Sequence, residues 1–214
     1  MPINIFMIDQ TLIDNNSKSI TNAFSSATTI VDGLMSIKNV HTDECCKKLE
    51  NFIFNLPEDQ WSLESTPKED INKSRNRYRI NWKSDSIIEE LSMSYDAITP
   101  LINKVFTRTK EKVFIGLNIW KDTEGFQTGL HRDNDIIAVA MQIYQGKNVP
   151  KDCGTRFEID NEWLHLPYEH NSGYVLEQVD DIQQRIVHGT SLPTPKDCTR
   201  VSVYAIWSYP EFKK

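Results

Sequence analysis

Two short segments of the chain carry side chains that together could hold a metal ion. They are Thr128-Gly-Leu-His131-Arg132-Asp133 and Val187-His188-Gly189. Successive side chains of an extended strand point to opposite faces, so His131 and Asp133 would project side by side while Arg132 points away. With His188 they would place two imidazoles and one carboxylate on one face of an octahedral ion. This ligand set is typical of non-haem Fe(II) sites with open positions.

A third segment, Arg200-Val-Ser202, could bind an anion beside that metal. Arg200 follows His188 by twelve residues, and Ser202 lies two residues further on, on the same face of a strand. Arginine offers planar, permanently charged donors that suit bidentate contact with a carboxylate. The pair therefore fits the distal carboxylate of a metal-bound cosubstrate.

The ordered set of His-x-Asp, His-Gly and Arg-x-Ser resembles the Fe(II)/2-oxoglutarate-dependent oxygenases, over about residues 113–207. The resemblance implies that His131, Asp133 and His188 hold Fe(II). It also implies that 2-oxoglutarate chelates the iron and places its 5-carboxylate on Arg200 and Ser202. O2 would be the second cosubstrate, and succinate and CO2 would be released.

Two further residues are expected near the cosubstrate from the same resemblance. Asn118 precedes the His-x-Asp segment in an Asn-x-aromatic arrangement, but Trp120 lacks the phenol that some relatives have there, so only Asn118 is carried over. Tyr144 could contact the cosubstrate through its hydroxyl. Equally, it could be a core aromatic whose hydroxyl is satisfied elsewhere.

The substrate class follows less directly. Asp133 favours hydroxylation, because halogenating relatives lack this carboxylate. Relatives that repair nucleic acid carry Arg-x-Asn-x-x-x-Arg, whereas the corresponding positions here are Arg200, Ser202 and Ile206. We therefore favour the prolyl-hydroxylase-like branch over the nucleic-acid-dealkylating branch, with a peptidyl or small-molecule substrate.

Alternative interpretations remain open at this stage. His131 and Asp133 could form an ordinary surface ion pair while His188 caps a turn, and the domain could be a jelly-roll binding or structural module without redox chemistry. Nucleic-acid demethylation rests only on the basic stretch 73–112.

The composition bounds the class of protein. The chain has 214 residues, a net charge of −6 and a pI near 5.4, which favours one domain and argues against bulk electrostatic binding of nucleic acid. We expect no signal peptide and no membrane span. The four cysteines, at 45, 46, 153 and 198, have no metal-binding spacing, so reduced thiols in a cytoplasmic protein are expected. Whether Cys153 and Cys198 approach each other is open, as is the oligomeric state.

The helical signals lie before residue 113. We expect residues 1–30 to form a loosely held polar arm and residues 31–112 to supply helical support and a substrate-side segment, within one compact domain. Apolar residues recur at helical spacing from Thr42 or Asp43 to Pro57, and again from Ser84 or Asp85, with a restart at Thr99-Pro100.

A basic stretch lies between these helices. If residues 75–80 are extended, Arg75, Arg77 and Arg79 share one face. They could form a basic wall at the mouth of the site, with Arg77 and Arg79 as weak substrate candidates. We favour the alternative, an edge strand whose arginines face solvent. Whether residues 65–83 form a lid is open.

From residue 113 the period changes to that of strands. The pattern predicts strands at 113–120, 126–130, 136–145, 154–159, 173–178, 183–188 and 199–208. Such a run predicts a mainly β (α+β) fold, a sandwich or barrel. The family resemblance specifies residues 113–214 as the core of a double-stranded β-helix (jelly roll, cupin-like) with supporting N-terminal helices.

Overall fold

The chain folds into two antiparallel sheets with helices on one side. The computed structural model describes residues 7–63, 77–80, 85–106, 113–146 and 148–209. The larger sheet has eight strands in the order β1-β2-β9-β6-β11-β5-β4-β3, and the smaller sheet has three, in the order β10-β7-β8. The strand bounds are β1 Thr28–Val31, β2 Leu34–Lys38, β3 Trp61–Leu63, β4 Arg77–Ile80, β5 Phe114–Asp122, β6 Ile137–Gln145, β7 Thr155–Ile159, β8 Glu162–Leu166, β9 Ser172–Glu177, β10 Val187–Thr190 and β11 Arg200–Ser208.

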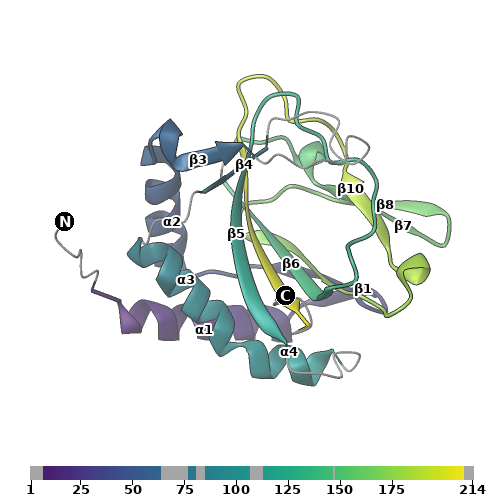
Figure 1. The fold of residues 1–214 in the computed structure, drawn as a ribbon, viewed down its shortest axis with the longest axis horizontal. Helices are drawn as coiled ribbons and strands as arrows, with labels where there is room; N and C mark the ends of the chain where they lie inside the picture. Colours follow the sequence, from purple (N-terminus) through teal and green to yellow (C-terminus); the bar gives the residue numbers. More distant parts are fainter. Residues whose placement is uncertain (1–6, 64–76, 81–84, 107–112, 147, 210–214) are drawn as a thin grey trace.

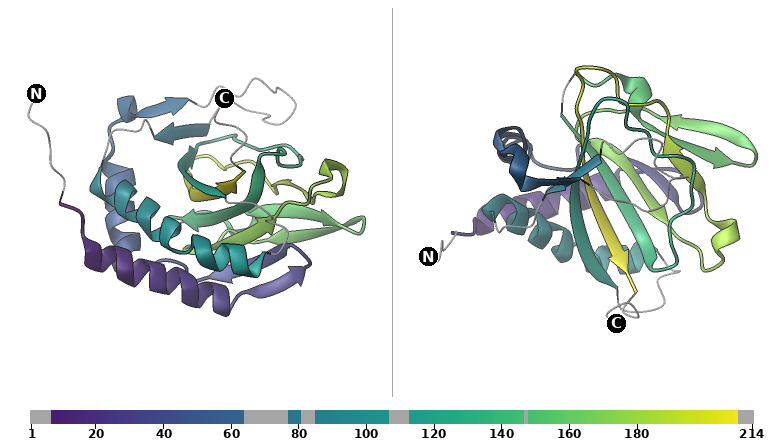
Figure 2. Two further views of the ribbon diagram at one scale, coloured as in Figure 1. Left: turned by 60° about the horizontal axis from the view of Figure 1, so that its bottom comes forward. Right: turned by 45° about the horizontal axis from the view of Figure 1, so that its top comes forward.

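Four α-helices cover one face of the larger sheet, and the smaller sheet lies on the other side of the molecule (Figures 1 and 2). They are α1 Gln10–Ser25, α2 Asp43–Asn55, α3 Ser86–Ala97 and α4 Thr99–Val105, with short 3-10 turns at Glu58–Gln60, Lys151–Cys153 and Ile182–Gln184. The mainly antiparallel fold with its supporting helices confirms the predicted class. None of the described helices is long and apolar enough to cross a lipid bilayer.

The predicted helix starts are confirmed by their caps. The Thr42 side chain accepts a hydrogen bond from the Cys45 backbone N–H, and Asp85 accepts one from the backbone N–H of Ile87. Each cap satisfies a donor that the first helical turn leaves without a partner. Pro100 stands in the first turn of α4, where its missing N–H is tolerated.

The expectation of a loosely held N-terminal arm is wrong. Residues 10–25 form α1, with Asp9 as its N-cap, and the helix buries Leu12, Ile20 and Phe24 in the main core. The segment is polar on average, yet its apolar residues fall on one stripe, which is sufficient for docking. Asn16, fully buried within that stripe, accepts a hydrogen bond from the Thr42 backbone N–H and so links α1 to the start of α2.

Strand β11 separates the core from the site. Its odd-numbered residues, Val201, Val203, Ala205 and Trp207, belong to the core under the helices. Its even-numbered residues begin with Arg200, Ser202 and Tyr204 and face the other way, because side chains alternate along a strand. β11 pairs with both β5 and β6 over nearly its whole length, so this polar face lies in the middle of the larger sheet.

Several predicted strands need correction. Residues 126–130 are not a strand; Thr128 carries only an isolated bridge, and the next isolated bridge joins His131 to His188. Residues 182–184 form a 3-10 turn, so β10 begins only at Val187. β8 was not expected. The larger sheet also recruits β1 to β4, from before residue 113, so its pairing crosses the expected boundary of the core.

Two questions left open by the sequence concern the cysteines and the segment 65–83. All four cysteines are free thiols, and Cys153 ends a 3-10 turn whereas Cys198 lies in a loop. The Cys153 sulfur contacts the Pro193 carbonyl, and the Cys198 sulfur contacts that of Asn148. Most of the segment 65–83, including Arg75, lies outside the described residues.

Candidate active site

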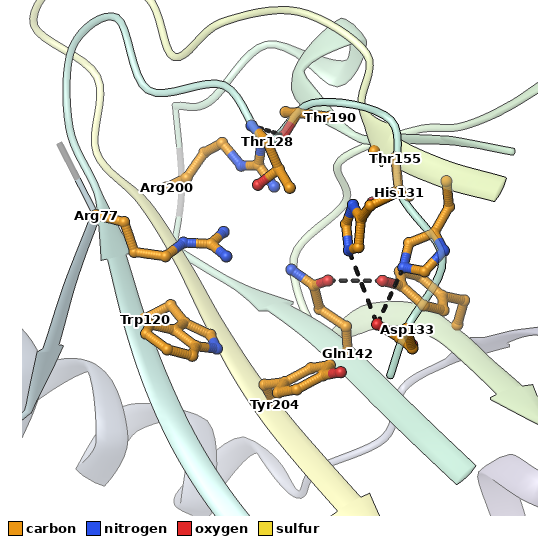
Figure 3. A pocket seen from close by; sticks show the side chains of 13 residues that line it. Arg77, Trp120, Thr128, His131, Asp133, Gln142, Thr155, Thr190, Arg200 and Tyr204 are labelled. Atoms are coloured by element: carbon orange, nitrogen blue, oxygen red, sulfur yellow. Dashed lines mark hydrogen bonds and ion pairs between the residues drawn. The ribbon is translucent and has the colours of Figure 1, made fainter. Parts of the chain in front are cut away.

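The three predicted metal ligands converge at one point. His131 and Asp133 lie on the segment before β6, and His188 lies on β10. The backbones of His131 and His188 exchange two hydrogen bonds, each 2.9 Å long. As a result, one ligand atom from each of the three side chains lies within 4.8 Å of the other two. Figure 3 shows His131 and Asp133 pointing to the same point in the pocket.

Hydrogen bonds fix which ring nitrogens face that point. The Nδ1 atom of His131 lies 2.9 Å from the Gly129 carbonyl oxygen, and that of His188 lies 3.2 Å from the Ile186 carbonyl oxygen. A carbonyl oxygen can only accept, so each Nδ1 carries a hydrogen, and a ring in its neutral form presents the lone pair of its Nε2. Backbone support of this kind is usual for histidines that bind a metal.

The third ligand is oriented in the same way. Gln178 Nε2 donates to Oδ2 of Asp133 at 2.8 Å, which leaves Oδ1 facing the histidines. Oδ1 lies 3.8 Å from Nε2 of His131 and 3.7 Å from Nε2 of His188. Three electron-pair donors without a hydrogen between them repel one another unless a cation binds them. The geometry and the donor types therefore fit a divalent metal such as Fe(II).

Burial keeps the first imidazole neutral. The pKa of His131 is lowered, first by burial and then by the neighbouring His188, while the Gly129 carbonyl and Asp133 act in the opposite direction. A neutral imidazole is the form that ligates a metal. The rings of His131 and His188 lie 4.5 Å apart between centroids, and His188 also stacks on Phe157.

Arg200 lines the same pocket, and some of its hydrogen-bond donors have no partner among the described residues. The residue is only 2% exposed, yet its Nε and one terminal nitrogen have no hydrogen-bond partner among the described residues. Its nearest carboxylate oxygen belongs to Asp122, at 4.0 Å from Nε, beyond hydrogen-bond range. A buried guanidinium with unsatisfied donors is costly, and an anionic ligand would remove that cost.

The pocket between Arg200 and the triad encloses about 130 Å³. A cavity of ~150 Å³ admits a benzene-sized molecule, so a small dicarboxylate is an occupant of the right order. The pocket is lined mainly by polar and aromatic residues: Arg77, Trp120, Thr128, His131, Asp133, Gln142, Thr155, Tyr174, His188, Gly189, Thr190, Arg200 and Tyr204.

A second arginine lines the pocket but is already paired. Arg77 donates from Nε and a terminal nitrogen to the two oxygens of Asp122, at 2.7 and 2.9 Å. Its guanidinium also lies over the rings of Trp120 and Phe126. In Figure 3 it points into the pocket beside Arg200. β4 is flanked by β3 and β5, so the favoured alternative of an edge strand with solvent-facing arginines is wrong for Arg77.

The remaining predicted residues lie close by but do not line the pocket. Ser202 shares the Arg200 face of β11, where its hydroxyl accepts from Gln142 Nε2 at 3.1 Å, and Gln142 lines the pocket whereas Ser202 does not. Tyr144 is fully buried and its hydroxyl contacts that of Thr155 at 2.6 Å, so it supports a lining residue. Asn118 and Arg79 are half-buried, and Trp120 lines the pocket in place of Asn118.

Sequence reasoning missed the residues that support the site. Gln178 and Asp122 were given no role, and neither was Arg185, whose guanidinium donates to the carbonyl of Asp133 at 2.9 Å and to that of Asn134. Asp122 had one available signal, because extending the predicted strand 113–120 by two residues would place it on the same face as Asn118 and Trp120. Gln178 and Arg185 fell within the predicted strands 173–178 and 183–188, whereas the structure places both in the connection between β9 and β10.

Solved structures share this fold. A Pseudomonas putida prolyl-4-hydroxylase is 13% identical over 90% of this chain and 98% of its own, with a TM-score of 0.65. A Trichoplax adhaerens prolyl hydroxylase, in complex with a peptide fragment of the hypoxia inducible factor oxygen degradation domain, is 16% identical over 94% and 93%, also with a TM-score of 0.65. HygX from Streptomyces hygroscopicus, with nickel, 2-oxoglutarate and hygromycin B bound, is 10% identical over 90% and 87%, with a TM-score of 0.58. The sequence matches no family model, and no curated protein sequence is significantly similar. The fold is thus that of the 2-oxoglutarate and Fe(II) oxygenases, which confirms the predicted jelly roll.

Proposed function

We propose that this chain is an Fe(II)- and 2-oxoglutarate-dependent dioxygenase that hydroxylates a C–H bond of its substrate. One observation carries the proposal: the triad of His131, Asp133 and His188 and the unpartnered donors of Arg200 face the same small pocket. A metal and a carboxylate are the two groups that these features call for. A dicarboxylate that chelates the bound metal at one end could bind Arg200 at the other.

The charges in the pocket support the same pair of ligands. Arg77 and Arg200 are balanced by Asp122 and Asp133, so the buried groups sum to zero when both imidazoles are neutral. Fe(II) adds two positive charges, and the 2-oxoglutarate dianion removes them. Burying a net charge is expensive, so this balance favours the metal and the dianion together over either alone.

When bound, Fe(II) with 2-oxoglutarate and O2 supplies the oxidising power for hydroxylation, with release of succinate and CO2. The protein contributes orientation and enclosure. Arg200 would hold the distal carboxylate of the cosubstrate, beside the hydroxyls of Thr155 and Thr190. Tyr174 donates to Gln142 Oε1 at 2.8 Å, and Gln142 donates to Ser202, which fixes that wall of the pocket.

For the substrate, we propose a peptidyl or small-molecule carbon and favour the prolyl-hydroxylase-like branch. Two similar folds are prolyl hydroxylases, one of them with a peptide bound, and a third contains hygromycin B. Arg77 would form part of the substrate-side wall. Because Asp122 already compensates its charge, we expect the group next to the iron to be neutral. Arg79 is a weaker candidate, because it faces the same way as Trp120 without lining the pocket.

Succinate formation tests the proposal. Purified protein incubated with Fe(II), 2-oxoglutarate and O2 should release succinate even without the primary substrate, through uncoupled turnover. The His131→Ala variant should release none, because one of three metal ligands is lost. Equal succinate from both proteins would reject the assignment, and none from either would favour a jelly-roll binding module.

A further inference from the structure

We propose that Gln178 and Arg185 are positioning residues that make Asp133 a one-oxygen metal ligand and hold it against the two histidines. This inference rests on the proposed function. It concerns a feature that the triad alone does not explain. A carboxylate can bind a metal through one oxygen or both, and binding through both would close a position that the cosubstrates need.

Gln178 determines which oxygen is free. It follows β9 directly, its backbone N–H donates to the Ala138 carbonyl at 2.8 Å, and the residue is 2% exposed. Its Nε2 donates to Oδ2 of Asp133, while its own Oε1 has no hydrogen-bond partner within the described part of the chain. Turning the amide over would place two acceptor oxygens in contact. The amide therefore holds Oδ2 away from the metal position at the cost of one unsatisfied carbonyl.

Arg185 fixes the backbone of the same ligand. The guanidinium is buried and donates from Nε to the Val179 carbonyl at 2.8 Å and from a terminal nitrogen to the carbonyls of Asp133 and Asn134. In return, Nε of Arg132 donates to the Arg185 carbonyl at 3.1 Å. The two arginines thus tie the ligand segment to the connection between β9 and β10 through three hydrogen bonds, and the bond to Val179 braces the connection itself.

These contacts replace a strand ladder that the site lacks. Around His131 and Asp133 the chain makes only isolated bridges, so regular pairing does not fix the position of Asp133. Gln178 and Arg185 both belong to the connection that leads into β10, which carries His188. His188 and the two residues that support Asp133 therefore lie on one continuous segment, which helps to keep the three ligand atoms at a fixed spacing.

Metal binding without turnover tests this inference. We would compare wild type, Gln178→Met and Gln183→Met by calorimetric titration with Mn(II) and by the visible spectrum of bound Co(II). Methionine keeps the length of glutamine but cannot donate. Gln183 is an exposed glutamine in the same connection and serves as the matched control.

Loss of a group that supports a metal ligand typically weakens metal affinity by about 10- to 100-fold. We expect that loss for Gln178→Met, together with a changed Co(II) spectrum, and neither change for Gln183→Met. Wild-type Mn(II) affinity and an unchanged Co(II) spectrum in a folded Gln178→Met protein would overturn the inference. If wild type itself bound no metal, the proposed function would fail instead.

The Arg185→Lys variant provides a second test in case Gln178→Met does not fold. Lysine keeps the positive charge but cannot reach the separate carbonyls that a guanidinium fork reaches. We expect weaker Mn(II) binding in this variant as well. Wild-type affinity in a folded Arg185→Lys protein would contradict the role given to Arg185.

Discussion

His131 and His188 are joined through their backbones as well as through their shared role, because each donates its N–H to the carbonyl of the other at 2.9 Å. Fifty-six residues separate them in sequence. This two-residue bridge sets the distance between the imidazoles. Any change that moves the segments at 128–131 and 187–190 apart should disturb the metal centre before it unfolds the protein.

Gly189 offers a direct test of that bridge. A Cβ at this position would lie 2.8 Å from the Gly129 carbonyl oxygen and 3.0 Å from that of Thr128, and neither backbone atom can move independently. We expect Gly189→Ala to cost about 1–3 kcal/mol in the free energy of unfolding and to weaken Mn(II) binding. Gly116→Ala is the control, since its Cβ would meet only the flexible Ile206 side chain. Unchanged Mn(II) affinity in Gly189→Ala would show that metal binding does not depend on this backbone bridge.

Replacing Arg200 should affect the cosubstrate and spare the metal. Hydrogen bonds to charged groups contribute about 1.5–3 kcal/mol, so Arg200→Gln should weaken 2-oxoglutarate binding by roughly 10- to 100-fold. The affinity for Mn(II) should stay within about twofold of wild type, because Arg200 contacts no ligand of the triad. Titration of the apoprotein with Mn(II) measures the first affinity, and titration of the Mn(II)-loaded protein with 2-oxoglutarate under argon measures the second. Equal cosubstrate affinity would remove Arg200 from the binding site.

Asp122 should be important for stability. It is 1% exposed and holds Arg77 through two hydrogen bonds, so Asp122→Asn leaves a partly buried guanidinium without its counter-charge. We expect a loss of about 3–5 kcal/mol in the free energy of unfolding. Lys121 pairs with Glu58, whose side chain is 86% exposed, and Glu58→Gln should cost about 1 kcal/mol or less. Denaturant titration of both variants measures the two losses in the free energy of unfolding. Losses of similar size would contradict the greater importance of Asp122.

Buried His41 should make the protein sensitive to acid. It lies between the Tyr95 hydroxyl and Gln145 Nε2, both at 2.8 Å, and burial lowers its pKa from 6.5 to about 3. Between those values the unfolded chain binds a proton that the folded chain does not. This contribution to stability is therefore present above pH 6.5 and is lost as the pH falls, at up to about 1.4 kcal/mol per pH unit.

The His41→Asn variant removes the titrating group and tests that pH dependence. Its free energy of unfolding should fall less steeply with pH between 6.5 and 4 than that of wild type, whatever its stability at neutral pH. Denaturant titrations at several pH values provide the comparison. Identical slopes would show that His41 does not stay neutral in the folded protein.

A local rule predicted two of the three candidate metal ligands, whereas His188 was added from the ordered resemblance to the oxygenase family. The spacing of His131 and Asp133 places two ligands on one side of an extended segment, whether or not that segment belongs to a regular strand. Arg200 and Ser202 follow the same rule along β11. The helix starts at Thr42 and Asp85 were likewise readable from single capping residues.

The residues that support Asp133 are placed by tertiary contacts, which the local sequence pattern does not determine. Gln178 and Arg185 were predicted to lie in strands 173–178 and 183–188, but both lie in the connection between β9 and β10, whose course depends on contacts with the rest of the fold. The N-terminal helix was missed for a related reason, because its average polarity hides a narrow apolar stripe. Arg77 was assigned to solvent because its partner Asp122, forty-five residues away, could not be foreseen.

The most direct measurement is the visible absorption of the protein with Fe(II) and 2-oxoglutarate in the absence of O2. Chelation of the iron by the cosubstrate should produce a charge-transfer band that requires both additions and that is lost in Asp133→Ala. Wild-type protein that stays colourless under these conditions, while remaining folded, would contradict the account.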